Sequence, residues 1–331
     1  MASDLSDELV QIIDLTITYS PGDSPPVRAL DHASLEIHRG EVIGVLGESG
    51  SGKSTLASAL LRLLPPQGQY EGGSVLFRGR NLLTLTEPEL RNVRGKEISL
   101  ISQDPALSLN PVMRVGDQIA EVVRAHVAMN GSERRQHVEE LLRAVGFDRP
   151  RQIYSAYPHQ LSGGQRQRVV ITQAIACRPV LVIADEPTSK LDAALQAEIL
   201  GLLSEIRERD GTAFLVISHD PTIFPGFADR IVVMYAGRIV EEGKTQDIFR
   251  KPLHPYTQAL VRLSERYLVN ARASRMQFSV IHGEAPDLTR IGVGCRFEPR
   301  CPERMQQCAS CDPRDLTPEP FHRVSCFKYG S

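Results

Sequence analysis

An octapeptide with three glycines and a lysine, Gly-Glu-Ser-Gly-Ser-Gly-Lys-Ser at residues 47–54, constrains the fold of this chain more than any other segment. It follows a short apolar run at 41–46, typical of a buried strand, and it precedes residues 54–64, which have the apolar spacing of a helix. A glycine-rich turn in this position directs consecutive backbone N–H groups into one concavity, together with the positive end of the helix dipole. Lys53 would reach the β and γ phosphates of a nucleotide, and the Ser54 hydroxyl would hold Mg²⁺.

The alternative interpretation of the octapeptide is a flexible glycine and serine turn without a ligand. The chain contains only six lysines. A chance match to the full pattern is therefore expected on the order of once in a few hundred such chains. We interpret residues 47–54 as a phosphate-binding loop.

A second apolar run, residues 181–184, ends in two adjacent carboxylates, Asp185 and Glu186. Neighbouring side chains at the end of a strand point in different directions, so the two can act separately. Asp185 would bind Mg²⁺ through its coordination shell, and Glu186 would polarise the attacking water as the general base. Taken alone, such a pair is usually the start of a solvated loop. Together with the phosphate-binding loop, it predicts a hydrolytic site.

The order of the predicted elements indicates an α/β fold. Strands are predicted at 10–20, 29–37, 41–46, 180–184, 213–218 and 230–235. A mostly helical stretch at about 105–157 separates the early strands from the late ones, and the alternation predicts a mainly parallel sheet covered on both faces. After about residue 250, proline-punctuated segments and a cysteine cluster replace this pattern, so a domain boundary is predicted there.

Composition excludes several classes of protein. The hydrophobic fraction of 41% and the charged fraction of 24% are typical of a globular protein. The net charge of −2 shows that the chain lacks the excess of basic residues found in most nucleic-acid-binding proteins. The longest unbroken apolar run, residues 231–236, is far shorter than the roughly 20 residues that a membrane-spanning helix needs. Residues 1–8 are acidic and lack the features of a secretion signal. We therefore expect a cytosolic chain with no nucleic-acid partner.

Residues 161–165, Leu-Ser-Gly-Gly-Gln, precede a helical run at 166–176 and predict a second set of free N–H groups at a helix N-terminus. Here the sequence resembles the ATP-binding subunits of ABC transporters, whose signature motif is this pentapeptide. The resemblance implies a P-loop NTPase cassette at 8–250, with a RecA-like core, an antiparallel β subdomain and a helical subdomain at about 105–165, followed by a small cysteine-rich extension at 251–331. It also implies head-to-tail pairing, in which the signature of one chain closes the ATP site of the other.

The resemblance assigns roles to single residues. Tyr19 matches the aromatic residue that stacks on adenine, and Gln103 matches the glutamine that contacts Mg²⁺ and water and senses the membrane partner. Asp192 lies in the loop that crosses the dimer interface, and His219 matches the switch histidine at the γ-phosphate. Singly, each could be a surface tyrosine, a polar turn, an exposed acid or a capping histidine. Six motifs in the right order over about 200 residues disfavour those alternatives.

The resemblance therefore implies a complete set of site residues. The expected ATP contacts are Tyr19, Gly47, Ser49, Gly50, Gly52, Lys53, Ser54, Thr55, Gln103 and Asp185, of which Ser54, Gln103 and Asp185 also hold Mg²⁺. The expected catalytic residues are Glu186 and His219, and the residues expected to act in the partner's site are Leu161, Ser162, Gly163, Gly164, Gln165 and Asp192.

Two residues depart from the family pattern. Lys190 stands where a small residue is usual, and Pro221 follows His219, where most relatives continue without proline. Either departure could alter the interface packing or the switch. Because the catalytic residues, the signature and the loop lysine are intact, we expect the chain to supply competent halves to both composite ATP sites.

Further segments resemble one branch of the family, the oligopeptide/dipeptide importer subunits, nearly end to end. They are residues 103–111, 177–179, 254–257, 283–288 and 294–302. The resemblance implies a homologous ATP-binding partner, two transmembrane permease subunits, an external solute-binding protein acting indirectly, and a peripheral position at the cytoplasmic face of the inner membrane. Relatives in this branch also import nickel and other small solutes. The alternative from another class is a soluble ABC ATPase without a transport role, although such chains generally carry two cassettes or long insertions within the cassette.

Five of the six cysteines lie between residues 295 and 326. Thiols stay reduced in a cytosolic chain, so metal ligation is favoured over a disulfide framework, and four thiolates can hold either zinc or an iron–sulfur cluster. The family resemblance implies a 4Fe-4S cluster on Cys295, Cys301, Cys308 and Cys326. It leaves Cys311 unmatched, and zinc or unligated thiols stay as alternatives because spacing alone discriminates weakly. Cys177, inside a helical apolar run, is predicted to be a core residue.

Overall fold

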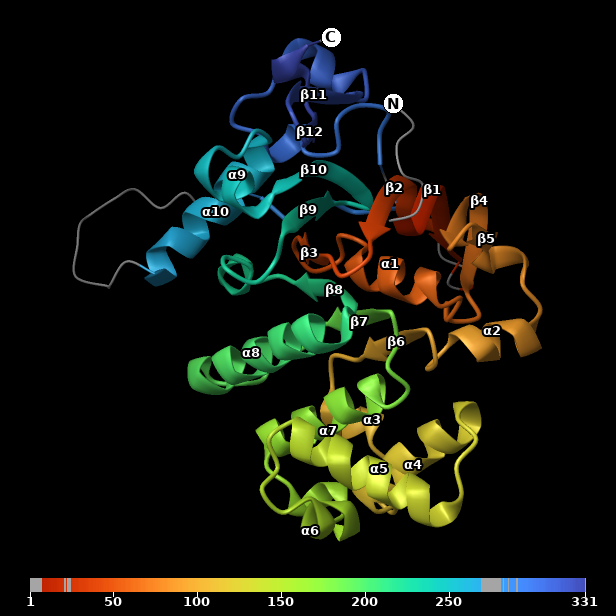
Figure 1. The fold of residues 1–331 in the computed structure, drawn as a ribbon. Helices are drawn as coiled ribbons and strands as arrows, with labels where there is room; N and C mark the ends of the chain where they lie inside the picture. Colours follow the sequence, from red (N-terminus) through yellow and green to blue (C-terminus); the bar gives the residue numbers. More distant parts are fainter. Residues whose placement is uncertain are drawn as a thin grey trace, which may run out of the picture. The chain divides into compact units, whose positions relative to one another are not determined.

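The computed structural model describes residues 8–20, 22, 25–268, 281, 283–284, 286–289 and 291–330. The chain divides into two compact units, whose elements are labelled in Figure 1. Unit 1 comprises Met1–His38, Val42–Leu83 and Ile217–Ser331, and unit 2 comprises Arg39–Glu41 and Thr84–Val216. The predicted cassette at 8–250 therefore contributes to both units, whereas residues 105–165 lie within unit 2.

Unit 1 contains an antiparallel sheet of four strands in the order β2-β1-β4-β5. The strands are β1 (Glu8–Tyr19), β2 (Val27–His38), β4 (Gly68–Phe77) and β5 (Arg80–Asn81). The alternating apolar residues of β1 and β2 predicted both strands. β4 was not predicted, because its first half is polar and glycine-containing; pairing with β1 holds it in the sheet.

Unit 1 also contributes five strands to a second sheet, in the order β11-β12-β10-β9-β3. They are β3 (Val42–Leu46), β9 (Arg230–Tyr235), β10 (Arg238–Lys244), β11 (Asp315–Glu319) and β12 (His322–Ser325). β3 is buried throughout and pairs in parallel with β9, whereas β10, β12 and β11 add on in antiparallel fashion. This part of the sheet is therefore mixed: β3 and β9 are parallel, as predicted, and three antiparallel strands extend the sheet beyond β9.

A buried carboxylate attaches the residues after 250 to this sheet. Glu241 of β10 accepts hydrogen bonds from the backbone N–H groups of Leu253 and His254, at 2.7 and 2.8 Å, and its Oε1 lies 2.7 Å from Nε2 of His322 in β12. Burial lowers the pKa of His254 to about 4, so its ring is neutral at pH 7 and Nδ1 accepts a hydrogen bond from the N–H of Tyr256. A buried charge is costly unless it is hydrogen-bonded. The hydrogen bonds to Glu241 therefore favour the observed packing of the residues after 250 on this sheet over alternative arrangements.

The helices of unit 1 are α1 (Lys53–Leu60), α9 (Thr245–Arg250) and α10 (Pro255–Leu268). Short 3₁₀ turns are η3 (Pro221–Ile223), η4 (Glu298–Arg300), η5 (Gln306–Ala309) and η6 (Phe327–Tyr329). α1 ends four residues before the predicted limit of 64, because Arg62 takes a positive φ of 51° and prolines follow at 65 and 66. Within the described residues, no helix combines the length and apolar character needed to cross a membrane.

Unit 2 contains β6 (Ile98–Ile101), β7 (Leu181–Asp185) and β8 (Ala213–Ser218), in the order β8-β7-β6. The last two residues of β8 belong to unit 1. Its helices are α2 (Glu87–Val93), α3 (Pro105–Ser108), α4 (Val115–His126), α5 (Gly131–Ala144), α6 (Pro150–Ser155), α7 (Gly163–Ile175) and α8 (Ala193–Asp210), with 3₁₀ turns η1 (Leu82–Thr84) at its border and η2 (Pro158–Gln160). β6 and β7 pair in parallel, and the helices from α3 to α7 lie between them in the chain. The predicted helical insertion is therefore observed.

Candidate functional site

The phosphate-binding loop connects the end of β3 to the start of α1. Gly52 is the N-cap of α1, and no side chain caps the first turn of the helix. The Lys53 side chain is buried, and its Nζ donates to the carbonyl oxygens of Gly47 and Glu48, both at 2.8 Å. The ammonium group therefore lies against the curled backbone of the loop. An uncapped helix N-terminus next to a buried cation is an arrangement that favours phosphate oxygens.

Two glycines of the loop are required by packing as well as by the turn. A Cβ atom on Gly47 would collide with the carbonyl oxygen of Met234 in β9. Gly52 has φ 101°, and a Cβ atom there would lie 2.5 Å from the carbonyl oxygen of Ala29 in β2. The loop is therefore packed directly against the backbone of two strands, and this contact sets its shape.

Tyr19, at the end of β1, lies beside the start of α1. Its hydroxyl donates to Oγ1 of Thr55 at 3.4 Å, and a Cβ atom on Gly68 would lie 2.9 Å from the tyrosine ring. The structure thus brings Tyr19 and Thr55 together, as expected if both contact the same nucleotide. The assignment of the ring to adenine stays a prediction.

His219 is exposed directly after β8. The next residue, Asp220, accepts a hydrogen bond from the N–H of Thr222 at 2.9 Å and caps the 3₁₀ turn η3, in which Pro221 is the first residue. A proline is compatible with that position, because the missing N–H has no partner within such a turn. Pro221 therefore starts the turn after His219 without breaking a hydrogen bond.

In unit 2, the acidic pair lies at the end of β7. Asp185 is the last residue of the strand, and Glu186 follows it with φ 52° and only 9% of its surface exposed. A positive φ is unfavourable for a residue with a side chain, and such conformations often occur at functional sites. The Glu186 carbonyl accepts hydrogen bonds from both the N–H and the Oγ of Ser189, at 3.3 and 3.2 Å, which stabilises the turn.

Lys190, the first departure from the family pattern, forms an ion pair with Asp104. The hydrogen bond from Lys190 holds the pKa of Asp104 below its ordinary value. Asp104 directly follows the exposed Gln103, after the end of β6, so the pair connects the segment of Gln103 with the segment that leads to Asp192. Asp192 itself accepts hydrogen bonds from the N–H groups of Ala194 and Leu195 and is the N-cap of α8.

The signature segment forms the start of α7. Ser162 is the N-cap, its Oγ accepts a hydrogen bond from the N–H of Gln165 at 3.3 Å, and the Gln165 side chain accepts one from the N–H of Ser162 at 3.0 Å. The expectation that this helix start leaves its N–H groups free is therefore wrong for Gln165, because its N–H donates a hydrogen bond to Oγ of Ser162. Leu161 is buried, Gly164 approaches the Leu195 side chain, and a Cβ atom on Gly163 would meet nothing within 4 Å.

The expected site residues are divided between the two units. Unit 1 holds Tyr19, the loop residues Gly47, Ser49, Gly50, Gly52, Lys53, Ser54 and Thr55, and His219. Unit 2 holds Gln103, the signature residues, Asp185, Glu186 and Asp192. Each unit therefore carries one part of the expected chemistry: phosphate binding in unit 1, and water activation and partner contacts in unit 2.

Four of the cysteines are neighbours in unit 1. The N–H of Cys295 donates to the carbonyl of Cys308 at 2.8 Å, and burial raises the pKa of Cys295 to about 11, with further contributions from Cys308, Cys326 and Cys301. Cys311 is exposed and outside this set. No group of three or more histidine, cysteine, aspartate or glutamate side chains among the described residues is placed to hold a metal ion.

Cys177 is half-buried in unit 2, and its thiol lies 3.8 Å from the carbonyl oxygen of Val122. Burial raises the pKa of this thiol. The predicted core position is therefore realised only in part, because Cys177 is half-buried.

The residues after 250, here called the tail, make contacts with the phosphate-binding loop that were not predicted from the sequence. The Arg300 guanidinium binds both carboxylate oxygens of Glu48, at 2.7 and 3.1 Å, and the hydroxyl of Tyr256 accepts a hydrogen bond from the N–H of Glu48 at 2.8 Å. The sequence signal for these contacts is the pair of arginines, Arg296 and Arg300, between Cys295 and Cys301. This spacing does not identify the residues that the arginines bind.

Comparison with known proteins identifies relatives along nearly the whole chain. Residues 30–189 match the family described as ABC transporter, and residues 240–308 match the one described as Oligopeptide/dipeptide transporter, C-terminal region. The oligopeptide transport ATP-binding protein OppD of Escherichia coli (strain K12) is 42% identical over 99% of this chain and 95% of the relative. AppD of Bacillus subtilis (strain 168), with the same description, is 40% identical over 94% of both chains. The dipeptide transport ATP-binding protein DppD of E. coli is 41% identical over 91% of both.

Solved structures agree on the fold. A dimeric structure of the ATP-binding cassette MJ0796, bound to ADP and Pi in a post-hydrolysis state, is 30% identical with a TM-score of 0.64, and the match covers 72% of this chain and 99% of that one. CbiO1 from Clostridium perfringens, part of the ABC transporter complex cbiONQ, is 27% identical with a TM-score of 0.64, over 74% and 92% of the two chains. The expected α/β cassette fold is therefore confirmed.

Proposed function

This chain belongs to the family of ATP-binding proteins of oligopeptide and dipeptide ABC transporters, and on that premise we propose that it binds and hydrolyses ATP to power the import of peptides. The observation that carries this proposal is the 40–42% identity to such proteins over 91–99% of the chain. The match of residues 240–308 to the C-terminal region of peptide transporters supports the choice of peptides over other solutes.

The residues of the two units take complementary roles in this proposal. The uncapped start of α1 and the Lys53 ammonium bind the phosphates, and the Tyr19 ring stacks on the base. The oxygen donors of Ser54, Gln103 and Asp185 suit Mg²⁺, which when bound neutralises charge on the β and γ phosphates. Glu186 removes the proton of the attacking water, and His219 contacts the γ-phosphate.

The signature and Asp192 act in the ATP site of a homologous partner subunit. The open space at Gly163 supports this role, because a partner's nucleotide can approach the backbone closely there. We further propose that the pair docks on two transmembrane permease subunits at the cytoplasmic face of the inner membrane, and that an external binding protein delivers the peptide. ATP-driven closure of the pair then moves the permease between inward-open and outward-open states.

Transport by the reconstituted complex tests the proposed function. Proteoliposomes that contain this chain, its homologous partner and the two permease subunits should accumulate a labelled peptide when Mg-ATP and the binding protein are supplied. Omission of the binding protein is the control and should abolish uptake. ATPase activity that is indifferent to permease and peptide would contradict the proposal and favour an ABC ATPase without a transport role, and uptake of nickel in place of peptide would move it to another solute.

We also propose that Cys295, Cys301, Cys308 and Cys326 hold a 4Fe-4S cluster. The support is that the four cysteines are neighbours, and that burial raises the pKa of Cys295, Cys301 and Cys326, with a further contribution from the neighbouring thiols. Such a region is unfavourable for thiolates without a bound cation. A single zinc ion needs its four sulfurs roughly 3.8 Å apart because each Zn–S bond is about 2.3 Å long. The thiolates of a cluster bind different iron atoms, so they need not meet this requirement for a single ion.

Metal analysis after anaerobic purification tests the cluster. The wild-type chain should contain iron and acid-labile sulfide in equal amounts, with the visible absorbance of a cluster. Cys301→Ser should lose most of both, because one ligand is gone, whereas Cys311→Ser should keep them, since Cys311 is exposed and outside the set of four. Stoichiometric zinc without sulfide, or a chain without either metal, would show that the cluster assignment is wrong.

A further inference from the structure

The segment between Cys295 and Cys301 carries two arginines whose side chains are almost completely buried. The side chain of Arg296 is 8% exposed and that of Arg300 is 7% exposed. Arginine is rarely buried unless its charge is paired, so the partners of these two side chains indicate what the segment does. The acidic partners are Asp31 and Glu48, which both lie in the cassette part of unit 1. Glu48 belongs to the phosphate-binding loop, and Asp31 precedes the loop in the chain.

Arg300 binds the phosphate-binding loop directly. Its guanidinium forms a two-pronged ion pair with Glu48, the second residue of the loop, and it donates a further hydrogen bond to the hydroxyl of Tyr235 at 3.3 Å. The backbone of Glu48 is held as well, because its N–H donates to the hydroxyl of Tyr256. Arg300 and Tyr256 therefore fix both the side chain and the main chain of one loop residue.

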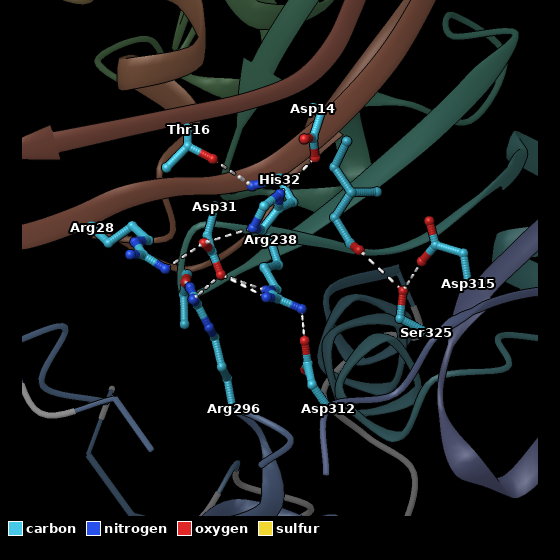
Figure 2. A network of polar contacts seen from close by, with 12 residues as sticks. Asp14, Thr16, Arg28, Asp31, His32, Arg238, Arg296, Asp312, Asp315 and Ser325 are labelled. Atoms are coloured by element: carbon cyan, nitrogen blue, oxygen red, sulfur yellow. Dashed lines mark hydrogen bonds and ion pairs between the residues drawn. The ribbon is translucent and has the colours of Figure 1, made fainter. Parts of the chain in front are cut away.

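Arg296 reaches the same loop through one intervening turn. It donates to the carbonyl oxygen of Ala236 and pairs with Asp31, which is 1% exposed and also binds Arg238 (Figure 2). The next residue of the turn, Gly237, donates its N–H to the carbonyl of Ser51 in the loop at 2.9 Å and accepts a hydrogen bond from the N–H of Asp31 at 3.0 Å. Arg296 thus stabilises the turn at Ala236 and Gly237, which is hydrogen-bonded to Ser51 of the loop.

Phe297 fixes the segment between the two arginines. Phe297 is 2% exposed, and its ring packs edge-on against Tyr235, with the ring centres 5.1 Å apart, and at a tilt against Tyr256, with the centres 5.5 Å apart. The two tyrosines that contact Arg300 and Glu48 are therefore in the same aromatic cluster as the tail segment. Residues 296–300 are attached to the cassette by one apolar anchor and two charged ones.

We propose that Arg296, Phe297 and Arg300, here called the tail buttress, position the phosphate-binding loop for ATP. A phosphate site depends on backbone N–H groups that already point at the ligand, and a loop held in that shape loses little entropy on binding. Arg300 also neutralises the Glu48 carboxylate, which would otherwise repel the incoming triphosphate. The buttress rests on the proposed nucleotide site, and it adds positioning residues from a segment more than 240 residues along the chain.

Equilibrium titration of the full chain with a fluorescent ATP analogue tests the buttress. Arg300→Ala should raise the Kd about tenfold, which corresponds to about 1.4 kcal/mol. Arg300→Lys keeps the charge but not the two-pronged geometry, and it should restore part of the affinity. The matched control is Arg304→Ala, since Arg304 is an exposed arginine in the same part of the tail that lies 3.7 Å from Glu298. The Kd of this variant should equal that of the wild type.

A double-mutant cycle separates positioning from general loss of structure. In the Glu48→Ala background, Arg300→Ala should change the Kd by less than about twofold, because the carboxylate that it positions is absent. In the assembled complex, Arg300→Ala should raise the KM for ATP and leave kcat nearly unchanged, a separation that misfolding would not produce. An unchanged Kd in Arg300→Ala, or the full tenfold effect in both backgrounds, would overturn the buttress. A wild-type chain that binds no ATP analogue would instead refute the proposed nucleotide site.

Discussion

Glu186→Gln is expected to lower the rate of ATP hydrolysis by about a hundredfold to ten-thousandfold while ATP still binds. The reason is that the amide cannot accept the proton of the attacking water, and general-base catalysis accounts for a factor of this size. The substitution keeps the size of the side chain, and the backbone contacts of the turn, from Ser189 to the Glu186 carbonyl, do not involve the carboxylate. Single-turnover hydrolysis and nucleotide binding, measured on the reconstituted complex, separate the two effects.

The control for this substitution is Glu205→Gln. Glu205 is an exposed glutamate of α8, so its replacement removes the same charge without touching the acidic pair. Its hydrolysis rate should match that of the wild type. Retention of more than a tenth of the wild-type rate in Glu186→Gln would contradict the assignment of Glu186 as the general base.

Gly52→Ala is expected to abolish measurable ATP binding and to destabilise the chain. The new Cβ atom would lie 2.5 Å from the Ala29 carbonyl, a backbone atom of β2 that cannot move without disturbing the pairing with β1. Relief of the overlap must therefore displace the loop and the first turn of α1. We expect a cost of about 1–3 kcal/mol from overpacking, in addition to the strain of a positive φ. Thermal unfolding and the same fluorescent titration measure the two consequences.

Gly79→Ala separates the overlap from the backbone strain. Gly79 has φ 76°, but a Cβ atom there would meet nothing within 4 Å, and the residue lies in the turn between β4 and β5 outside the loop. Its replacement should cost about 1–2 kcal/mol and leave ATP binding intact. Equal loss of ATP binding in both variants would show that general destabilisation, rather than the shape of the loop, explains Gly52→Ala.

Features that depend on neighbouring residues in the chain were predictable. β8 and β9 have the predicted bounds, 213–218 and 230–235, because each consists almost entirely of an apolar run typical of a buried strand. The phosphate-binding loop was recognisable for a similar reason, since its turn, its lysine and its helix start are all local. The acidic pair at the end of β7 was likewise predictable, because its position relative to the apolar run is set by the local sequence.

Features that depend on distant partners were not predictable. The polar first half of β4 gives no strand signal, and it becomes a strand through pairing with β1. Lys190 looked like a disturbance of the family pattern, yet it pairs with Asp104, 86 residues earlier in the chain. The prediction of free N–H groups at the signature was wrong in part, because the N–H of Gln165 donates to the Ser162 hydroxyl. Whether this hydrogen bond forms depends on the rotamer of Ser162.

The sequence by itself determined which residues can carry the chemistry: a glycine-rich loop with one lysine, two carboxylates after a strand, and a second glycine-rich helix start. Only the tertiary structure decided what holds the loop in place, namely Tyr256 and Arg300 at Glu48, 208 and 252 residues away. The physical reason is that turn and strand propensities are local, whereas the partner of a buried charge is chosen by the packing of the whole unit. The cysteine-flanked arginines are recognisable in the sequence, but their contact with the phosphate-binding loop exists only in the folded chain.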